Sequence, residues 1–354
     1  MNNMRRLVVT VVFLGCAALV LVTCSKQPAG DTAKFDADGT AHITRVIPMP
    51  STISPEAQQW LQSLTLKKSP SQTLAERRAS TDKWREEDSA EAKKRFPVNV
   101  EEKNISGVRT DIITPANFPE QNHSRVLINL HGGGFNSDSG SLIEAIPIAS
   151  LAGIKVVSVY YRLAPENPFP AAVEDVVAVY KELLKEYKPG SIGIFGTSAG
   201  AILTGEVAVK LRQLGLPLPG ALGMFSTLAD FSRAGDSVSL FTLDGLPGEL
   251  APPDPNRGHP NDEYPGKTDR KDPVLSPLYA DLHGFPPSLL ITSTRDLLLS
   301  DTAIFHRALM RSGVDAQLLV YEALPHAFWY HFQLPETQET LDAMARFFDQ
   351  KLAR

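Results

Sequence analysis

Residues Ser191–Gly200 read Ser-Ile-Gly-Ile-Phe-Gly-Thr-Ser-Ala-Gly, and they carry the clearest fold signal in the chain. An apolar run of strand character ends in Gly-x-Ser-x-Gly, and a helical stretch follows from Ala201. This pattern is typical of a nucleophile elbow, a sharp strand-to-helix turn that exposes one serine. Such a turn crowds any Cβ atom beside the serine, so only small residues fit at positions 196 and 200. The stretch therefore predicts Ser198 as a nucleophile.

A glycine-rich loop upstream supports this interpretation. Arg125–Leu130 has the character of a buried strand, and His131-Gly132-Gly133-Gly134-Phe135 follows directly. Acyl transfer builds negative charge on a carbonyl oxygen, and closely approaching backbone N–H groups stabilise that charge. A His-Gly-Gly-Gly run after a strand is the form such an oxyanion loop takes. We expect His131 to order the loop rather than to act as a base.

An acid and a histidine follow two later strands. Ser288–Ser293 is strand-like and leads to Asp296, and Ala316–Tyr321 is strand-like and leads to His326. The chain order Ser, Asp, His is the one expected of an α/β-hydrolase. Histidine titrates near neutrality, so it can take the serine proton and return it. The carboxylate fixes the imidazole tautomer and stabilises the imidazolium.

Two rivals compete for these roles. Asp301 falls five residues after Asp296, inside the following helix, where we interpret it as a helix N-terminal charge. His331 lies among aromatic residues, which favours a packed histidine over a base. The remaining histidines have no strand-end context and are expected to be solvated: His42, His123, His259, His283 and His306.

Five motifs and two single residues together resemble one known family. They are His131-Gly-Gly-Gly-Phe135, Tyr161-Arg-Leu-Ala-Pro-Glu166, Phe169-Pro-Ala-Ala-Val-Glu-Asp175, Gly196-Thr-Ser-Ala-Gly200 and Asp272-Pro-Val-Leu-Ser-Pro277, with Asp296 and His326. The chain resembles the hormone-sensitive-lipase family of α/β-hydrolases, the bacterial family IV esterases. The resemblance implies an α/β-hydrolase fold, in which a mostly parallel central sheet has helices on both faces and a helical cap. It also implies a triad and an oxyanion hole, which are Ser198, Asp296 and His326, and the N–H groups of Gly133, Gly134 and Ala199.

The chain departs from the family pattern at three positions. Thr197 stands where the family commonly has Asp, which places the chain nearer the Gly-Thr-Ser-Ala-Gly branch. Leu297 follows the acid where Pro is usual, which leaves Asp301 as a minor rival. Ala327 follows the histidine where Gly is usual. None of these changes removes a group of the implied triad.

A group of charged residues near the glycine loop has a structural interpretation. We expect Arg162, Glu166 and Asp175 to form a buried charge network there. After Pro170, the apolar positions from Val173 to Leu184 have helical spacing. These charges are therefore predicted to support the fold rather than the chemistry.

Composition excludes several function classes. The chain has 354 residues, 43% hydrophobic and 21% charged, as in ordinary globular proteins. Strands alternate with helical patterns from about residue 105, which predicts a mostly parallel sheet. The net charge of −5 argues against nucleic acid as a partner. No Cys or His cluster has zinc spacing and no phosphate-binding glycine loop is present, so we expect no metal and no cofactor.

The N-terminus predicts export. Residues 1–6 are basic and residues 7–23 are apolar, which is the architecture of a signal peptide or membrane anchor over residues 1–24. Residues 21–24 also resemble a bacterial lipobox, in which Cys24 becomes lipid-modified. An uncleaved anchor is the alternative, because 17 apolar residues barely span a bilayer at about 1.5 Å each. We therefore expect a cell-envelope protein, membrane-anchored or periplasmic. The only cysteines are Cys16 and Cys24, so the folded domain is expected to lack disulfides.

The rest of the chain divides into a tether and one domain. Residues 25–45 are expected to form a polar tether, and residues 46–354 the hydrolase domain. By resemblance, a cap comes from about residues 50–97 and 230–272. Ser54-Pro55-Glu56 predicts a helix start within it. Ala251–Lys271 has no helical or strand period, which favours a binding loop or lid; a disordered surface insertion is the alternative.

These observations favour a serine carboxylic-ester hydrolase that acts on small or short-chain acyl esters through an acyl-enzyme. The alternatives are a non-catalytic binding protein of the same fold, and a lactonase or deacetylase with the same triad. The expected partner is a small ester. A membrane is expected to be contacted only through the N-terminal segment, and the sequence leaves a homodimer open.

Overall fold

The computed structural model describes residues 32–64, 72–246 and 263–353, and the chain divides into two units, Met1–Met49 and Pro50–Arg354. In the first unit, β1 (Thr32–Phe35) and β2 (Ala41–Thr44) pair as an antiparallel hairpin whose residues are all exposed. This hairpin occupies part of the segment that was expected to be a polar tether. The predicted leader, residues 1–24, lies outside the described residues. Within the described ranges, no helix is long and apolar enough to cross a membrane.

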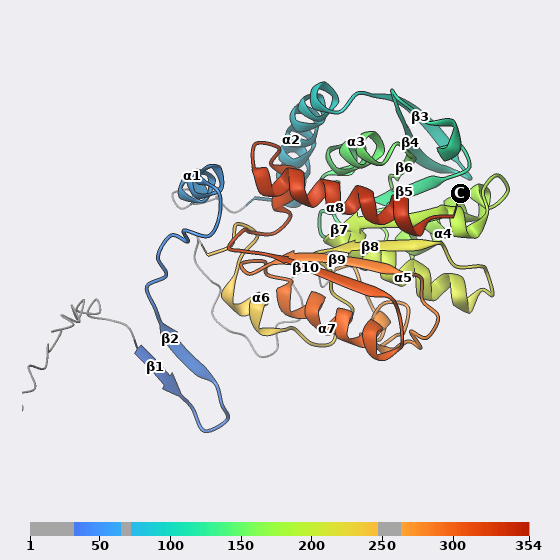
Figure 1. The fold of residues 1–354 in the computed structure, drawn as a ribbon. Coiled ribbons are helices and arrows are strands. Elements are labelled where there is room, and N and C mark those ends of the chain that lie inside the picture. Colours follow the sequence, from blue (N-terminus) through green and yellow to red (C-terminus); the bar gives the residue numbers. More distant parts are fainter. Residues whose placement is uncertain (1–31, 65–71, 247–262, 354) are drawn as a thin grey trace, which may run out of the picture. The chain divides into compact units, whose positions relative to one another are not determined.

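The second unit is built on an eight-stranded sheet with the order β10-β9-β8-β7-β5-β6-β4-β3 (Figure 1). Its strands are β3 (Val98–Ile105), β4 (Val108–Pro115), β5 (Val126–Leu130), β6 (Lys155–Val159), β7 (Ile192–Thr197), β8 (Ala221–Phe225), β9 (Ser288–Ser293) and β10 (Ala316–Tyr321). β4 pairs antiparallel with both β3 and β6, and all other pairs are parallel. The predicted mostly parallel sheet is therefore confirmed.

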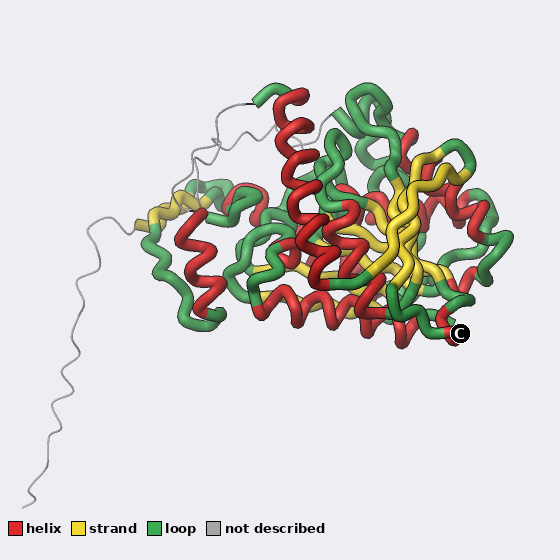
Figure 2. Tube along the Cα trace, turned by 90° about the horizontal axis from the view of Figure 1, so that it is seen from above, coloured by secondary structure: helices red, strands yellow, loops and turns green. Residues whose placement is uncertain are grey.

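The central strands are buried along their whole length. Every residue of β5, β7, β8 and β9 is buried, as expected for strands that helices cover on both faces. Figure 2 shows the same sheet from above, with the twist that L-amino acids impose on neighbouring strands.

Helices cover both faces of this sheet, as predicted (Figure 1). One face packs against α3 (Ser141–Ala152) and α8 (Pro335–Lys351), and the other against α4 (Ala171–Leu183), α5 (Ala199–Gln213) and α7 (Leu299–Arg311). The remaining helical elements are α1 (Pro55–Leu64), α2 (Leu74–Arg95), α6 (Asp236–Leu240), and the short 3-10 helices η1 (Glu120–Asn122), η2 (Pro189–Ser191), η3 (Pro277–Tyr279) and η4 (Phe328–Tyr330). Each face therefore has its own hydrophobic core.

Two helices precede the sheet, where one part of the cap was expected. α1 begins at Pro55, and the Ala57 N–H donates to Ser54 Oγ at 3.1 Å, so the predicted helix start is confirmed. α2 begins with a capping box between Thr73 and Glu76. The second expected part, residues 230–272, contains α6, but residues 247–262 lie outside the described residues. The cap assignment stays a prediction.

The strand order marks one edge of the sheet as a site for chemistry. β5 lies between β6 and β7, so the chain winds in opposite directions from this point. In parallel α/β sheets, ligands bind outside the carboxyl ends of the strands at such a switch point. Leu130, the last residue of β5, pairs with Gly196 near the end of β7. The segments that follow β5 and β7 therefore begin side by side.

Candidate active site

Ser198 lies on a strained turn between β7 and α5. Its backbone has φ 58° and ψ −121°, a conformation that residues other than glycine rarely adopt. The Ser198 N–H donates to the carbonyl oxygen of Phe225 at 2.9 Å, which ties the turn to the end of β8. A Cβ atom at Gly196 or Gly200 would lie 2.2 or 1.7 Å from the carbonyl oxygen of Leu130. The turn thus requires glycine on both sides of a partly exposed serine.

The glycine loop lies directly beside this serine. A Cβ atom built on Gly132 would be 3.5 Å from Ser198 Cβ. Gly133 and Gly134 both have positive φ values, 104° and 61°. Among the described residues, neither of their N–H groups has an acceptor. Ala199 is the first residue of α5, where backbone N–H groups have no partner within the helix. These three N–H groups are therefore available for a ligand oxygen.

His131 is held inside the loop. Its ring stacks on Tyr161 with centroids 4.1 Å apart and planes 7° from parallel. The Tyr161 hydroxyl donates to the His131 carbonyl oxygen at 2.7 Å. His131 Nδ1 lies 2.8 Å from the carbonyl oxygen of Gly132. The ring is buried, and these contacts give it the loop-ordering position that was predicted.

His326 and Asp296 form a close pair after the last two strands. His326 Nδ1 lies 2.8 Å from Asp296 Oδ1, which also accepts the Leu298 N–H at 2.9 Å. Asp296 Oδ2 accepts the hydroxyl of Thr292 at 2.9 Å and that of Ser226. Burial raises the pKa of Asp296, but the charge of His326 and these hydrogen bonds outweigh burial and lower it overall. The site thus holds an ionised carboxylate against the ring nitrogen of a histidine.

Asp301 and His331, the alternative candidates for the acid and the base, lie where they support the fold. Asp301 is in the first turn of α7, as predicted. His331 packs on Trp60 with ring centroids 4.1 Å apart, and burial lowers its pKa to about 4. His331 is therefore the packed histidine that the sequence predicted, and its lowered pKa keeps it neutral near pH 7.

The charge network near the loop differs from the prediction. Arg162 pairs with Asp175 at 2.9 Å, as predicted, and also with Glu174 at 3.2 Å. Glu166 instead pairs with Arg78 of α2 through both carboxylate oxygens, at 2.7 and 2.8 Å. The guanidinium of Arg162 is half-exposed, so the network is not buried. The prediction for Glu166 was wrong because its partner comes from a helix 88 residues earlier.

α2 also contacts the glycine loop through a hydrogen bond and a salt bridge. Arg78 donates from Nε to the carbonyl oxygen of Asn136 at 2.6 Å, and Arg85 pairs with Asp138 at 2.6 Å. Asn136 and Asp138 lie in the segment just after Gly134 and Phe135. The loop is therefore supported by the helix that was expected to belong to the cap.

A tyrosine from the second expected cap segment packs on the same loop. Tyr264 stacks on Phe135 with centroids 3.4 Å apart and planes 6° from parallel. Its hydroxyl donates to Glu206 of α5, which is fully buried, and burial raises the Glu206 pKa well above its ordinary value. Neither residue was predicted from the sequence, because Tyr264 lies in a segment without any periodic signal and Glu206 lies inside the helix after the elbow.

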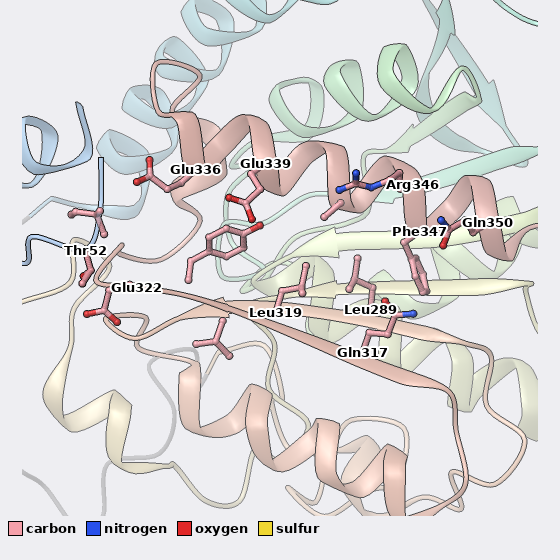
Figure 3. A pocket seen from close by; sticks show the side chains of 14 residues that line it. Thr52, Leu289, Gln317, Leu319, Glu322, Glu336, Glu339, Arg346, Phe347 and Gln350 are labelled. Carbon is pink, nitrogen blue, oxygen red and sulfur yellow. The ribbon is translucent and has the colours of Figure 1, made fainter. Parts of the chain in front are cut away.

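One surface hollow among the described residues lies away from these groups. A hollow of about 620 Å³ opens between α8 and strands β9 and β10 (Figure 3). Its labelled lining includes Leu319, Glu339 and Arg346, and none of the candidate catalytic residues.

Within the described ranges, no group of three or more His, Cys, Asp or Glu side chains is arranged to hold a metal ion.

Comparison with known proteins finds relatives that are named as esterases or acetyl-hydrolases. Residues 127–330 match the family of alpha/beta hydrolase fold proteins. An acetyl-hydrolase of Streptomyces hygroscopicus is 33% identical over 233 residues, which cover 65% of this chain and 77% of that protein. A solved esterase structure superposes with a TM-score of 0.76 at 35% identity, covering 89% of this chain and all of the other. An esterase of the bacterial hormone-sensitive lipase family gives a TM-score of 0.70 at 28% identity, covering 85% of this chain and 99% of its own.

Proposed function

Because the chain belongs to the alpha/beta hydrolase fold family, among the serine esterases of the hormone-sensitive-lipase type, we propose that it hydrolyses short-chain esters through Ser198, His326 and Asp296. The observation that carries the proposal is the pair of His326 and Asp296, 2.8 Å apart, at the same edge of the sheet as the strained serine turn. A neutral histidine oriented by a carboxylate is the base that a serine nucleophile needs.

The first half of the reaction forms an acyl-enzyme. Ser198 Oγ attacks the ester carbonyl carbon while His326 takes the hydroxyl proton through Nε2. The C–O bond to the alcohol then breaks, and His326 returns the proton to the leaving alkoxide. Asp296 stays ionised throughout and stabilises the imidazolium. The products of this half are a free alcohol and an acyl group on Ser198.

The N–H groups of Gly133, Gly134 and Ala199 are proposed to bind the oxyanion of each tetrahedral intermediate. Preorganised donors aimed at developing charge are worth about 2.7–4 kcal/mol each in related acyl-transfer sites. Their lack of acceptors among the described residues supports this role for Gly133 and Gly134. In the second half, water adds to the acyl group with the same histidine as base, and a carboxylic acid leaves.

We propose acetyl and other short acyl groups as the acid part of the substrate. The support is the acetyl-hydrolase from Streptomyces hygroscopicus among the relatives. An acyl-length series on one alcohol, from acetyl to decanoyl, tests this point. The highest kcat/KM is expected at two to four carbons, and a maximum at long chains would contradict it.

We also propose that the protein is exported and held at the cell envelope. The basic and apolar residues 1–24 support this, and they lie outside the described residues. Stable anchoring needs either several acyl chains, such as those that lipoproteins carry on the N-terminal cysteine, or an uncleaved helix.

The nucleophile is tested with Ser198→Ala. The variant should fold and lose several orders of magnitude in kcat, as expected when a triad member is removed. A fluorophosphonate probe should label the wild type at Ser198 and leave the variant unlabelled. Near wild-type turnover in the variant would refute the assignment.

A further inference from the structure

A buried glutamate links the segments that carry the proposed catalytic groups. Glu144 lies in the first turn of α3 and is fully buried. Its Oε1 accepts the hydroxyl of Thr197, the residue directly before Ser198. Its Oε2 accepts from Asn129 Nδ2 at 3.0 Å, and Asn129 lies on β5, which leads into the glycine loop. One carboxyl group therefore contacts both the elbow strand and the oxyanion-loop strand.

The histidine segment joins the same cluster. Trp329 Nε1 donates to Thr197 Oγ1 at 3.0 Å, and both residues are buried. Trp329 belongs to η4 and follows His326 by three residues. The hydroxyl of Thr197 thus lies between Glu144 and the loop that carries the proposed base.

The direction of each hydrogen bond can be deduced from chemistry. The indole N–H of Trp329 can only donate, so Thr197 Oγ1 accepts it and directs its own proton to Glu144. Asn129 Oδ1 accepts the hydroxyl of Ser158 at 3.0 Å, so its amino group faces Glu144. Both neighbours therefore donate to Glu144. Two converging donors suit an ionised carboxylate, which only accepts.

A proton on Glu144 would disturb this pattern. The amino group of Asn129 cannot accept, so the proton would either displace the threonine proton on the side of Thr197 or force the Asn129 amide to turn its oxygen toward Glu144. Burial raises the pKa of Glu144 to about 7, so this change falls near neutrality. Tyr330 of η4 faces the carboxyl group, and burial raises its pKa well above the ordinary value, which keeps it neutral. Among the described residues, no Lys, Arg or His lies within 4 Å of the Glu144 carboxylate.

We propose that Glu144 is a positioning residue for ester hydrolysis: its ionised form fixes Thr197, and with it Ser198, against the glycine loop and the histidine loop. The proposal rests on the proposed function, because it takes Ser198 and His326 as the reacting groups. Glu144 itself touches no substrate and acts through Thr197, Asn129 and Trp329.

The first test compares two substitutions of one hydroxyl. Thr197→Val keeps the shape of the side chain and removes the donor, and it should lower kcat by about tenfold with little change in KM, the order of one lost hydrogen bond to a charged group. Thr197→Ser retains the hydroxyl and should stay within about twofold of the wild type by the same reasoning. Circular dichroism and thermal melting check that both variants are folded.

The second test uses the pH profile, which a purely structural role would not change. If a proton on Glu144 costs the same order as the lost hydrogen bond, about tenfold, log(kcat/KM) of the wild type should fall below pH 7 by about one log unit more than protonation of the base alone requires. In Glu144→Gln only the base titrates, so this extra log unit should disappear. Glu206→Gln is the matched control, since Glu206 is equally buried but bonds to Tyr264, and its profile should keep the extra log unit.

The outcomes separate the two proposals. An extra log unit that persists in folded Glu144→Gln, or wild-type kcat in Thr197→Val, would overturn the role of Glu144. If Glu144→Gln does not fold, the contrast between Thr197→Val and Thr197→Ser carries the test, and equal kcat values in the two refute it. An active Ser198→Ala would instead refute the proposed function. An inactive Ser198→Ala with an unchanged Glu144→Gln profile refutes only this inference.

Discussion

Asp296→Asn should lower kcat by about a thousandfold and leave the fold in place. Asp296 receives four hydrogen bonds: Oδ1 accepts from His326 and from the Leu298 N–H, and Oδ2 accepts from the hydroxyls of Thr292 and Ser226. The amide of asparagine has one accepting and one donating side. The Leu298 N–H can only donate, whereas the two hydroxyls can rotate and accept. The amide should therefore turn its oxygen to Leu298 and His326.

This orientation sets the size of the effect. With an oxygen still facing Nδ1, the variant keeps the correct histidine tautomer and loses only the negative charge. Two unit charges about 4 Å apart attract by about 4 kcal/mol at an effective dielectric constant of 20. Losing that attraction to the imidazolium in the transition state corresponds to about a thousandfold in kcat. An amide turned the other way would also select the wrong tautomer and cost about ten thousandfold.

The assay is steady-state hydrolysis of p-nitrophenyl acetate, with Asp301→Asn as the matched control. Asp301 lies five residues away in the first turn of α7, and its variant should retain at least a third of wild-type kcat, since the loss of a helix N-terminal charge affects stability by about 0.3–1 kcal/mol. The reasoning is refuted if Asp296→Asn loses less than tenfold. A larger loss in Asp301→Asn would mean that the two carboxylates must exchange roles.

Three further outcomes are expected. Gly200→Ala should prevent stable folding, because the new Cβ would lie 1.7 Å from the Leu130 carbonyl oxygen, whereas Gly190→Ala meets only the Ala353 Cβ at 3.5 Å and should melt near the wild type in calorimetry. The raised Glu144 pKa means that the folded state prefers the protonated acid, so its contribution to stability is full below the unfolded pKa of about 4.5 and is lost as pH rises to about 7. In urea unfolding, the free energy of unfolding of Glu144→Gln should therefore rise relative to that of the wild type by about 3 kcal/mol between pH 4.5 and 7. A difference between the two proteins that does not change with pH would contradict this prediction. In cell fractionation, Cys24→Ala should release the protein from the membrane if Cys24 is lipid-modified; retention supports an uncleaved helix, and an intact soluble protein in the cytoplasm would contradict both.

The confirmed predictions concern local features, each of which depends on a few adjacent residues. The elbow, the helix start at Pro55 and the strands Ser288–Ser293 and Ala316–Tyr321 lie where the sequence placed them. Each depends on local sterics: glycines that admit a crowded turn, a serine that caps a helix, and apolar runs that favour buried strands. The alternation of strands and helical patterns also predicted a mostly parallel sheet, and the observed strand pairing has that arrangement.

The partners of individual side chains came only from the tertiary structure. Glu166 pairs with Arg78, Thr197 with Glu144, and Ser226 with Asp296, over separations of 88, 53 and 70 residues. No local pattern marks such pairs, because each depends on how two helices or loops pack on the finished sheet. The residues able to react were therefore evident from short motifs, while the buried groups that orient them became identifiable only once the core had brought distant segments into contact.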